Sequence, residues 1–212
     1  MIINKVKNIS DISFRTLLRG CKDVLLREDF RKILARDSEH YFIKTHELPY
    51  TKYFDGEYVV QIVRNPGLCF WSLYNFRREK NKTYDKSLTD LIKGEINWRS
   101  WSDYHYKWQD TADFLKERYL LIRYEDIYQN EMAVCKKLSK FINLPIIYSN
   151  TISFNYYHNK FPLMFRQGLL RGWEKYYSKK QLKLLWKLHG KNMSIFGYPE
   201  PKYYLGLEKE MY

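Results

Sequence analysis

Two short runs of apolar residues stand out in the hydrophobic and polar pattern of this chain. Residues 58–63 read YVVQIV and residues 119–123 read YLLIR, so both runs are compact and rich in β-branched or bulky side chains. Runs of this length and composition are typical of strands buried in a parallel sheet. The pattern therefore predicts two core strands, Tyr58–Val63 and Tyr119–Arg123.

Apolar residues at helical spacing flank these runs. Proline is favoured at the first position of a helix, so Pro66 opens a helix that we expect to reach about Arg78. Ser178 supplies a cap and Gly197 a stop for the last long helix, Ser178–Ile195. The other predicted helices are Ile12–Leu26, Ser102–Lys116 and Glu131–Phe141, and the other predicted strands are Met1–Ile9 and Tyr41–Lys44.

The alternation of strands and helices indicates the fold class. Each parallel strand needs a crossover connection, and that connection is usually a helix. We therefore expect an α/β fold in three layers, with a central, mostly parallel sheet flanked by helices. The chain contains no repeat and no Ser/Gly/Pro-rich linker, so residues 1–212 are expected to form one domain.

The charge balance indicates the kind of partner. The chain has 37 Lys and Arg against 24 Asp and Glu, a formal net charge of +13. Such a surplus favours an anionic partner, which could be nucleic acid, an acidic membrane face or a phosphorylated small molecule. Composition alone does not choose among these three.

The cysteines and the hydropathy exclude other classes. The three cysteines are far apart and lack the spacing of a zinc site, so we interpret them as reduced core thiols, and no metal is expected. No apolar run approaches the ~18 residues of a membrane span, and the first ten residues do not read as a signal peptide. We expect a cytoplasmic protein of unknown oligomeric state.

Residues suited to binding an anion follow the predicted strands. Ligands of open α/β sheets gather where strands end and helices begin, because helix N-terminal amides attract phosphate. Lys44, Arg64 and Arg123 lie at such strand ends. Ser72 follows Arg64 by eight residues, about two helical turns, so the two side chains could grip one phosphate. Taken alone, they could equally be a surface arginine and an ordinary helix serine.

Four stretches between Tyr41 and Tyr198 contain these strand ends together with further motifs. They are FIKTHELPY (Phe42–Tyr50), IVRNPGLCFWSLYNF (Ile62–Phe76), LLIRYEDI (Leu120–Ile127) and FRQGLLRGWEKYYS (Phe165–Ser178). In order and spacing they resemble the sulfotransferases that use 3′-phosphoadenosine 5′-phosphosulfate (PAPS) as donor. The resemblance implies the P-loop-NTPase-like sulfotransferase fold and transfer of a sulfuryl group without a metal.

The resemblance also implies roles for single residues. In the family pattern the histidine of the first stretch, here His46, is the general base, and Lys44 contacts the transferring group. The arginine and serine of the second stretch, Arg64 and Ser72, hold the 3′-phosphate, and Tyr124 approaches the adenine. The fourth stretch closes over the 3′-phosphate through Arg166, Gln167 and Gly168.

The N-terminal loop departs from the family pattern. The family's phosphosulfate loop corresponds here to residues 7–13, KNISDIS, in which Lys7 and Ser10 are the candidate donor contacts. This loop lacks the usual glycine, and Asp11 adds a negative charge that would repel a phosphosulfate. Gly67 and Leu68 stand where the family has an acidic residue after the proline, and Gln167 replaces a lysine. These departures concern catalysis more than fold.

The sequence therefore leaves three functions open. The first is a PAPS-dependent sulfotransferase that acts on a hydroxyl of a small molecule or saccharide, and the second is a catalytically weak or inactive relative that binds PAPS or its product PAP. The third, a basic nucleic-acid-binding module, has only charge and aromatic content in its favour, so no nucleic acid is expected. The acceptor is not specified, although aromatic residues at 98–108 could line its pocket, and His105 among them is interpreted as structural.

Overall fold

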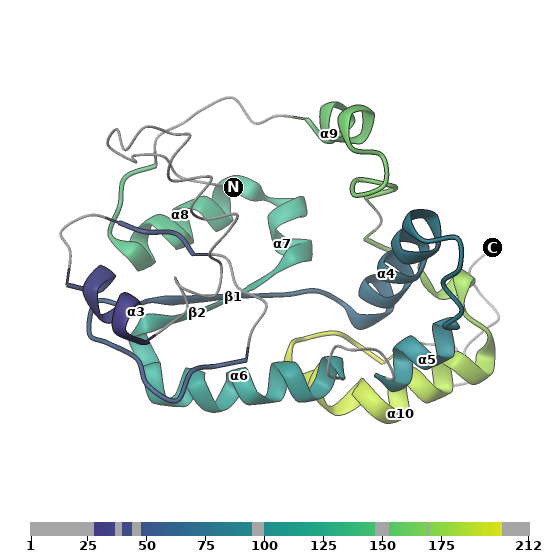
Figure 1. The fold of residues 1–212 in the computed structure, drawn as a ribbon, viewed down its shortest axis with the longest axis horizontal. Coiled ribbons are helices and arrows are strands. Elements are labelled where there is room, and N and C mark those ends of the chain that lie inside the picture. Colours follow the sequence, from purple (N-terminus) through teal and green to yellow (C-terminus); the bar gives the residue numbers. More distant parts are fainter. Residues whose placement is uncertain are drawn as a thin grey trace.

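The computed structural model describes residues 28–36, 40–43, 48–94, 100–146, 153–168 and 170–200. Helices and two strands alternate along this part of the chain (Figure 1). In chain order the elements are α3 (Glu28–Leu34), β1 (Val59–Val63), α4 (Pro66–Lys80), α5 (Leu88–Lys93), α6 (Trp101–Leu115), the 3₁₀ helix η1 (Lys116–Arg118), β2 (Tyr119–Arg123), α7 (Tyr124–Gln129), α8 (Glu131–Ile142), α9 (Phe154–Lys160), the 3₁₀ helix η2 (Glu174–Tyr176) and α10 (Lys179–Ile195).

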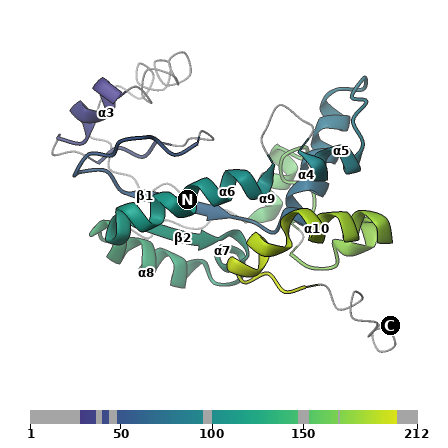
Figure 2. The same cartoon turned by 90° about the horizontal axis from the view of Figure 1, so that it is seen from below.

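The two strands pair in parallel, as the sequence predicts. Val59 lies opposite Tyr119 and Val63 opposite Arg123, so both strands end at the same edge of the sheet. Helix α6 packs on one face of β2 and α8 on the other, which gives three layers (Figures 1 and 2). The prediction of two buried strands is confirmed in part: on β2, Leu120 and Ile122 are buried and the other three residues are half-buried. On β1, Val60 and Ile62 are 38% and 56% exposed, so its face on the α8 side is open.

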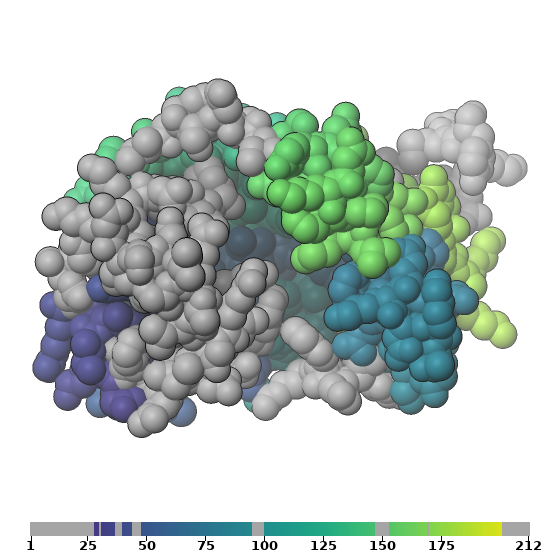
Figure 3. Space-filling view, turned by 45° about the horizontal axis from the view of Figure 1, so that its top comes forward, coloured from purple at the N-terminus to yellow at the C-terminus, as the bar shows by residue number. Residues whose placement is uncertain are grey.

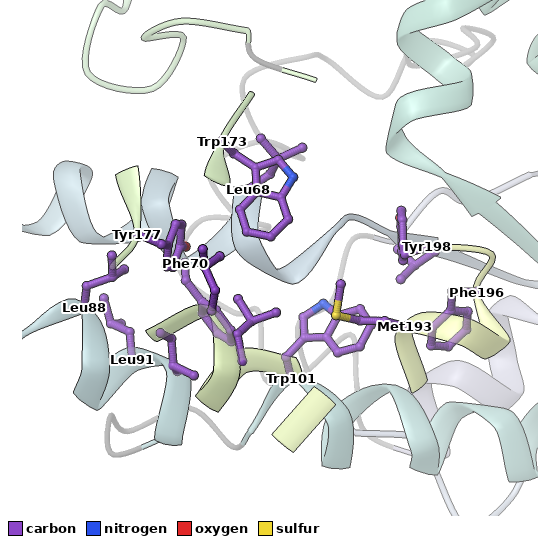
Figure 4. Close-up of a cluster of buried hydrophobic side chains, with 14 residues drawn as sticks. Leu68, Phe70, Leu88, Leu91, Trp101, Trp173, Tyr177, Met193, Phe196 and Tyr198 are labelled. Atoms are coloured by element: carbon purple, nitrogen blue, oxygen red, sulfur yellow. The ribbon is translucent and has the colours of Figure 1, made fainter. Parts of the chain in front are cut away.

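The main core lies beyond the ends of the strands. Helix α10 packs against α4, α5 and α6, and the side chains between these helices form one cluster (Figure 4). Leu91, Ile92, Leu185 and Met193 are almost fully excluded from solvent there. Because β1 leads directly into α4, this helical core holds the start of α4 against the sheet edge.

Local capping explains where the long helices begin. Pro66 occupies the first turn of α4, and the Asn65 side chain accepts a hydrogen bond from the Gly67 amide at 2.9 Å. Ser178 caps α10 in a reciprocal capping box with Gln181, which confirms the predicted start of this helix. Gly197 has a φ of +74°, so the predicted stop is also confirmed.

Other elements differ from the prediction. Residues 41–43 do not form a strand, since a strand needs a hydrogen-bonding neighbour that a local apolar pattern does not supply. The predicted strand Met1–Ile9 and helix Ile12–Leu26 lie outside the described residues. The short helices α3, α5, α7 and α9 were not predicted, because six or seven residues carry too little periodicity.

A buried ion pair ties α3 to the segment before β1. Arg31 donates two hydrogen bonds to the Glu57 carboxylate, at 2.7 and 2.6 Å, and its guanidinium lies 3.6 Å from the Tyr50 ring centroid. The charge of Arg31 is therefore buried and already paired. Cys69 is a free thiol, as expected. Among the residues described, no helix is long and apolar enough to cross a membrane.

Candidate functional site

The shared edge of the two strands brings Arg64 and Tyr124 together. Each residue directly follows the last paired residue of its strand, and their side chains come from neighbouring strand ends. The guanidinium carbon of Arg64 lies 4.4 Å from the centroid of the Tyr124 ring, within the range of a cation–π contact. Two residues predicted to hold a nucleotide, 60 positions apart in the sequence, thus form one contact.

The start of α4 lies beside this contact. Arg64 immediately precedes the N-cap Asn65, and the first turn of α4 carries no acidic residue. The helix has 15 residues, so the positive end of its dipole favours an anion near Arg64. Ser72 lies two turns further along α4 and is half-buried. The described site therefore combines an arginine with a helix N-terminus.

The backbone carbonyl of Arg64 is fixed by a tryptophan. The indole Nε1 of Trp101, on α6, donates a hydrogen bond to this oxygen at 3.2 Å, and the Cys69 thiol approaches it at 3.7 Å. Burial raises the pKa of Cys69 to about 11, although the neighbouring Arg64 cation opposes this shift. The thiol is thus protonated at neutral pH and is not a nucleophile.

The fourth stretch reaches the same helix. The Arg166 guanidinium lies 5.7 Å from the ring centroid of Trp71, which directly precedes Ser72, and Trp71 stacks on Tyr176 at 4.4 Å. Gly168 has a φ of +59°, which favours glycine, and a Cβ built there would lie 3.1 Å from the Phe154 ring. Gln167 is exposed. In the space-filling view the 153–168 segment stands forward beside α4 (Figure 3).

The fourth stretch, Phe165–Ser178, contacts the second, Ile62–Phe76, at Gly67. A Cβ at Gly67 would lie 2.2 Å from the Trp173 ring, and the Tyr177 hydroxyl donates a 2.6 Å hydrogen bond to the Gly67 carbonyl. Figure 4 shows Trp173 over the start of α4, next to Leu68. Any side chain at position 67 would therefore displace the tryptophan.

Four predicted site residues cannot be placed. Lys7, Ser10, Lys44 and His46 lie outside the described residues. Their roles at the reacting centre remain predictions from the sequence. Arg64, Tyr124, Ser72 and the 166–168 segment are described. Arg64 contacts Tyr124 at the start of α4, Arg166 contacts Trp71 on α4, and Gly168 lies against Phe154 of α9.

Glu125 is a residue of the site that the sequence did not single out. Its carboxylate accepts a hydrogen bond from the Asn65 amide at 3.0 Å and another from the Tyr198 hydroxyl at 2.8 Å. The residue lies in the quoted LLIRYEDI stretch, but its partners are 60 and 73 positions away, so no local signal identifies them. The adjacent Arg123 is paired with Asp126 at 2.6 Å, which makes it a poor anion contact.

The arrangement defines a class of protein. A cation and an aromatic ring at neighbouring parallel strand ends, followed by a helix N-terminus, are features with which α/β proteins bind phosphate-bearing ligands. In the described part of the chain, no group of His, Cys, Asp or Glu is arranged to hold a metal ion.

Comparison with known proteins identifies the family. A family model described as a sulfotransferase domain matches residues 28–197, well over half of the chain, so the chain belongs to the sulfotransferase family. Sulfotransferase 6B1 of Danio rerio is 24% identical over 161 residues, which are 67% of this chain and 54% of that protein. Human sulfotransferase 2B1 is 28% identical over 93 residues, 42% of this chain and 25% of that protein. The chain thus spans about half or less of these relatives.

A solved structure supports the same fold. The crystal structure of mouse sulfotransferase SULT7A1 complexed with PAP matches with a TM-score of 0.59 and 20% sequence identity. The match covers 71% of this chain and 63% of the mouse chain. The three-layer, P-loop-like sulfotransferase fold expected from the sequence is therefore confirmed.

Proposed function

We propose that this chain binds PAPS and transfers its sulfuryl group to a hydroxyl of a small molecule or saccharide. The observation that carries the proposal is the contact of Arg64 with Tyr124 at the start of α4. The mouse neighbour is a complex with PAP, which supports a nucleotide of this kind. We also propose that residues 1–212 act as one cytoplasmic domain that needs no metal.

The residues of the site fit the chemistry of the donor. A 3′-phosphate requires cations and hydrogen-bond donors, and Arg64, Arg166 and the Ser72 hydroxyl supply them, together with the positive end of the α4 dipole. An adenine requires flat apolar surfaces, and Tyr124 and Phe154 provide aromatic rings near the same segments. Both halves of the nucleotide thus have partners of suitable chemistry.

The roles of the chain's own residues follow from this assignment. When bound, the donor supplies an activated sulfuryl group, and its transfer leaves 3′,5′-ADP. Such transfers resemble phosphoryl transfer, in which positioning and cationic stabilisation supply most of the rate. Arg64 and Ser72 orient the nucleotide through its 3′-phosphate. His46 accepts the proton of the acceptor hydroxyl, and Lys44 stabilises negative charge on the reacting oxygens.

A second function is favoured by the N-terminal loop. Residues 7–13 carry Asp11 and no glycine, so the loop is poorly suited to a phosphosulfate. A chain with an intact 3′-phosphate site and an impaired loop would bind PAPS or PAP but transfer sulfate slowly or not at all. Binding and turnover must therefore be measured separately.

A transfer assay distinguishes the two functions. Sulfur-labelled PAPS is incubated with phenols, alcohols and saccharides, and the labelled product and released 3′,5′-ADP are quantified. A sulfotransferase moves label to at least one acceptor, and His46→Ala reduces the rate by about 10²–10⁴-fold, the usual contribution of a general base. His40→Ala, at an exposed histidine six residues earlier, serves as the control and leaves the rate unchanged. Nucleotide binding without transfer would establish the second function instead.

A further inference from the structure

The peptide unit between Arg64 and Asn65 is held at both of its polar groups by side chains from other elements. Its carbonyl oxygen accepts from the Trp101 indole at 3.2 Å, and its amide donates to Glu125 Oε1 at 3.0 Å. These partners come from α6 and α7, so neither bond belongs to a helix or to the strand ladder. The orientation of this peptide is therefore set by tertiary contacts.

This peptide determines how Arg64 is presented. It joins Arg64, the residue after β1, to Asn65, the N-cap of α4. Pro66, the residue after Asn65, has no amide hydrogen and so cannot fix the backbone by donating a hydrogen bond. A rotation of the 64–65 peptide about the Arg64 Cα–C bond would change the direction in which α4 leaves β1 relative to the Arg64 side chain. The Glu125 bond prevents that rotation on the amide side.

Tyr198 holds Glu125 in place. Its hydroxyl donates to Glu125 Oε2 at 2.8 Å, so the two carboxylate oxygens each have one donor. Tyr198 is 5% exposed, and burial is the main reason that its pKa is raised, so the hydroxyl keeps its proton at neutral pH. The residue follows the turn at Gly197, through which the chain leaves α10. The Glu125 carboxylate thereby connects Asn65 and Tyr198, which lie 60 and 73 positions away in the sequence.

The charge of Glu125 excludes direct contact with a phosphate as its role. A carboxylate repels a phosphate at close range, yet this one lies one residue after Tyr124 and bonds the residue after Arg64. Bonds from an N–H or O–H to a carboxylate are stronger than bonds to a neutral acceptor. A negative group at this position is thus suited to fixing the backbone.

We propose that Glu125, held by Tyr198, is a positioning residue that fixes the 64–65 peptide so that Arg64 presents its guanidinium to the 3′-phosphate of the nucleotide. This inference rests on the proposed function. It assigns to Glu125 and Tyr198 an effect on one phosphate and not on the nucleotide as a whole.

The test compares two ligands that differ by that phosphate. Dissociation constants for 3′,5′-ADP and 5′-AMP are measured by calorimetry, and their ratio reports the contribution of the 3′-phosphate. Glu125→Gln keeps the side-chain size but cannot accept both hydrogen bonds, and we expect it to reduce the ratio about tenfold. Tyr198→Phe removes only the hydroxyl and should reduce the ratio about threefold. Asp126→Asn, which weakens the neighbouring exposed ion pair with Arg123, is the matched control and should leave the ratio within twofold.

Each outcome decides the matter. Equal weakening of both ligands by Glu125→Gln, or a lower melting temperature with an unchanged ratio, would show a merely structural role and overturn the inference. If Glu125→Gln does not fold, the ratio measured for Tyr198→Phe decides in the same way. A wild-type protein that binds both ligands equally, or binds neither, would refute the proposed function itself. If instead the wild type prefers 3′,5′-ADP and the variants keep that preference, only the positioning role is refuted.

Discussion

At the scale of single residues, His105 shows how burial changes the chemistry of a side chain. It lies on α6, is 6% exposed, and is surrounded by the rings of Trp101, Tyr104 and Phe196. The Tyr119 hydroxyl donates to the Gln61 oxygen, so the Gln61 amide faces His105 Nδ1 at 2.7 Å as a donor. The ring is thus required to be neutral, and burial lowers its pKa to about 4. This confirms its interpretation as a structural residue.

This histidine makes stability depend on pH. Above the ordinary pKa of 6.5 both the folded and the unfolded states are neutral at this position, so its effect is constant. As the pH falls from 6.5 toward 4, the unfolded state binds a proton that the folded state does not, and stability decreases. Between pH 7 and pH 4.5 this amounts to about 2 kcal/mol.

Urea unfolding at the two pH values measures the effect. His105→Gln keeps a polar partner for Gln61 but does not titrate, so its free energy of unfolding should decrease by about 2 kcal/mol less than that of the wild type over this interval. Equal decreases for the two proteins would show that His105 is not held neutral in the folded state.

Gly67 gives a second prediction at the residue scale. Helix propensity favours Ala over Gly by about 1 kcal/mol, but a Cβ at Gly67 would lie 2.2 Å from the Trp173 ring. The steric clash outweighs the propensity, so Gly67→Ala should destabilise the protein by about 2 kcal/mol. Gly172→Ala is the comparison, since nothing lies within 4 Å of its Cβ and only its φ of +66° is unfavourable, which costs about 1 kcal/mol. Urea unfolding at neutral pH checks both variants, and a Gly67→Ala protein as stable as the wild type would contradict the contact.

At the scale of elements, the buried ion pair of Arg31 and Glu57 connects α3 to the segment that leads into β1. Their side chains are 6% and 18% exposed, and Arg31 also donates to the Lys52 carbonyl at 2.9 Å. Removing one partner would leave the other charge buried and unpaired, which is strongly destabilising. The pair therefore contributes a buried contact that holds α3 against the segment before β1.

Arg31→Ala should lower the free energy of unfolding by about 3 kcal/mol. The matched control is Lys52→Ala, because Lys52 forms an exposed pair with Glu28 at 3.1 Å, with both side chains 59% exposed. Such a pair contributes less than about 1 kcal/mol. Chemical denaturation of the two variants measures the difference. Similar losses from both would show that the Arg31 pair is no stronger than a surface contact.

The sequence predicted the long helices and the strands, but little of how they pack against one another. Both strands and the starts of α4 and α10 were found to within one residue, because a compact apolar run, Pro66 and Ser178 each act locally. The pattern did not indicate that β1 is open on one face, since exposure depends on whether a helix covers the strand. The contact of Gly67 with Trp173 joins residues 106 positions apart, and no periodicity encodes it. Glu125 was missed as a site residue for the same reason.

At the scale of the whole molecule, the sequence predicted the part of the candidate site that lies at the ends of the two strands. Arg64 and Tyr124 were expected near a nucleotide, and the parallel register of β1 and β2 explains why they meet. Lys44 and His46, which carry the predicted chemistry, lie outside the described residues. The net charge of +13 suits an anionic nucleotide but suits an anionic polymer equally well. The net charge therefore supports nucleotide binding only in combination with a defined binding site.

Calorimetric titration with 3′,5′-ADP at fixed ionic strength tests the central claim most directly. The account predicts micromolar binding by the wild type and about 100-fold weaker binding by Arg64→Ala, which corresponds to a loss of about 3 kcal/mol. Arg78→Ala removes an exposed arginine from the other end of α4 and should bind within twofold of the wild type. Absence of binding by the folded wild type, or equal affinity of the Arg64→Ala protein, would contradict a nucleotide site at the strand ends and direct the search to anionic polymers.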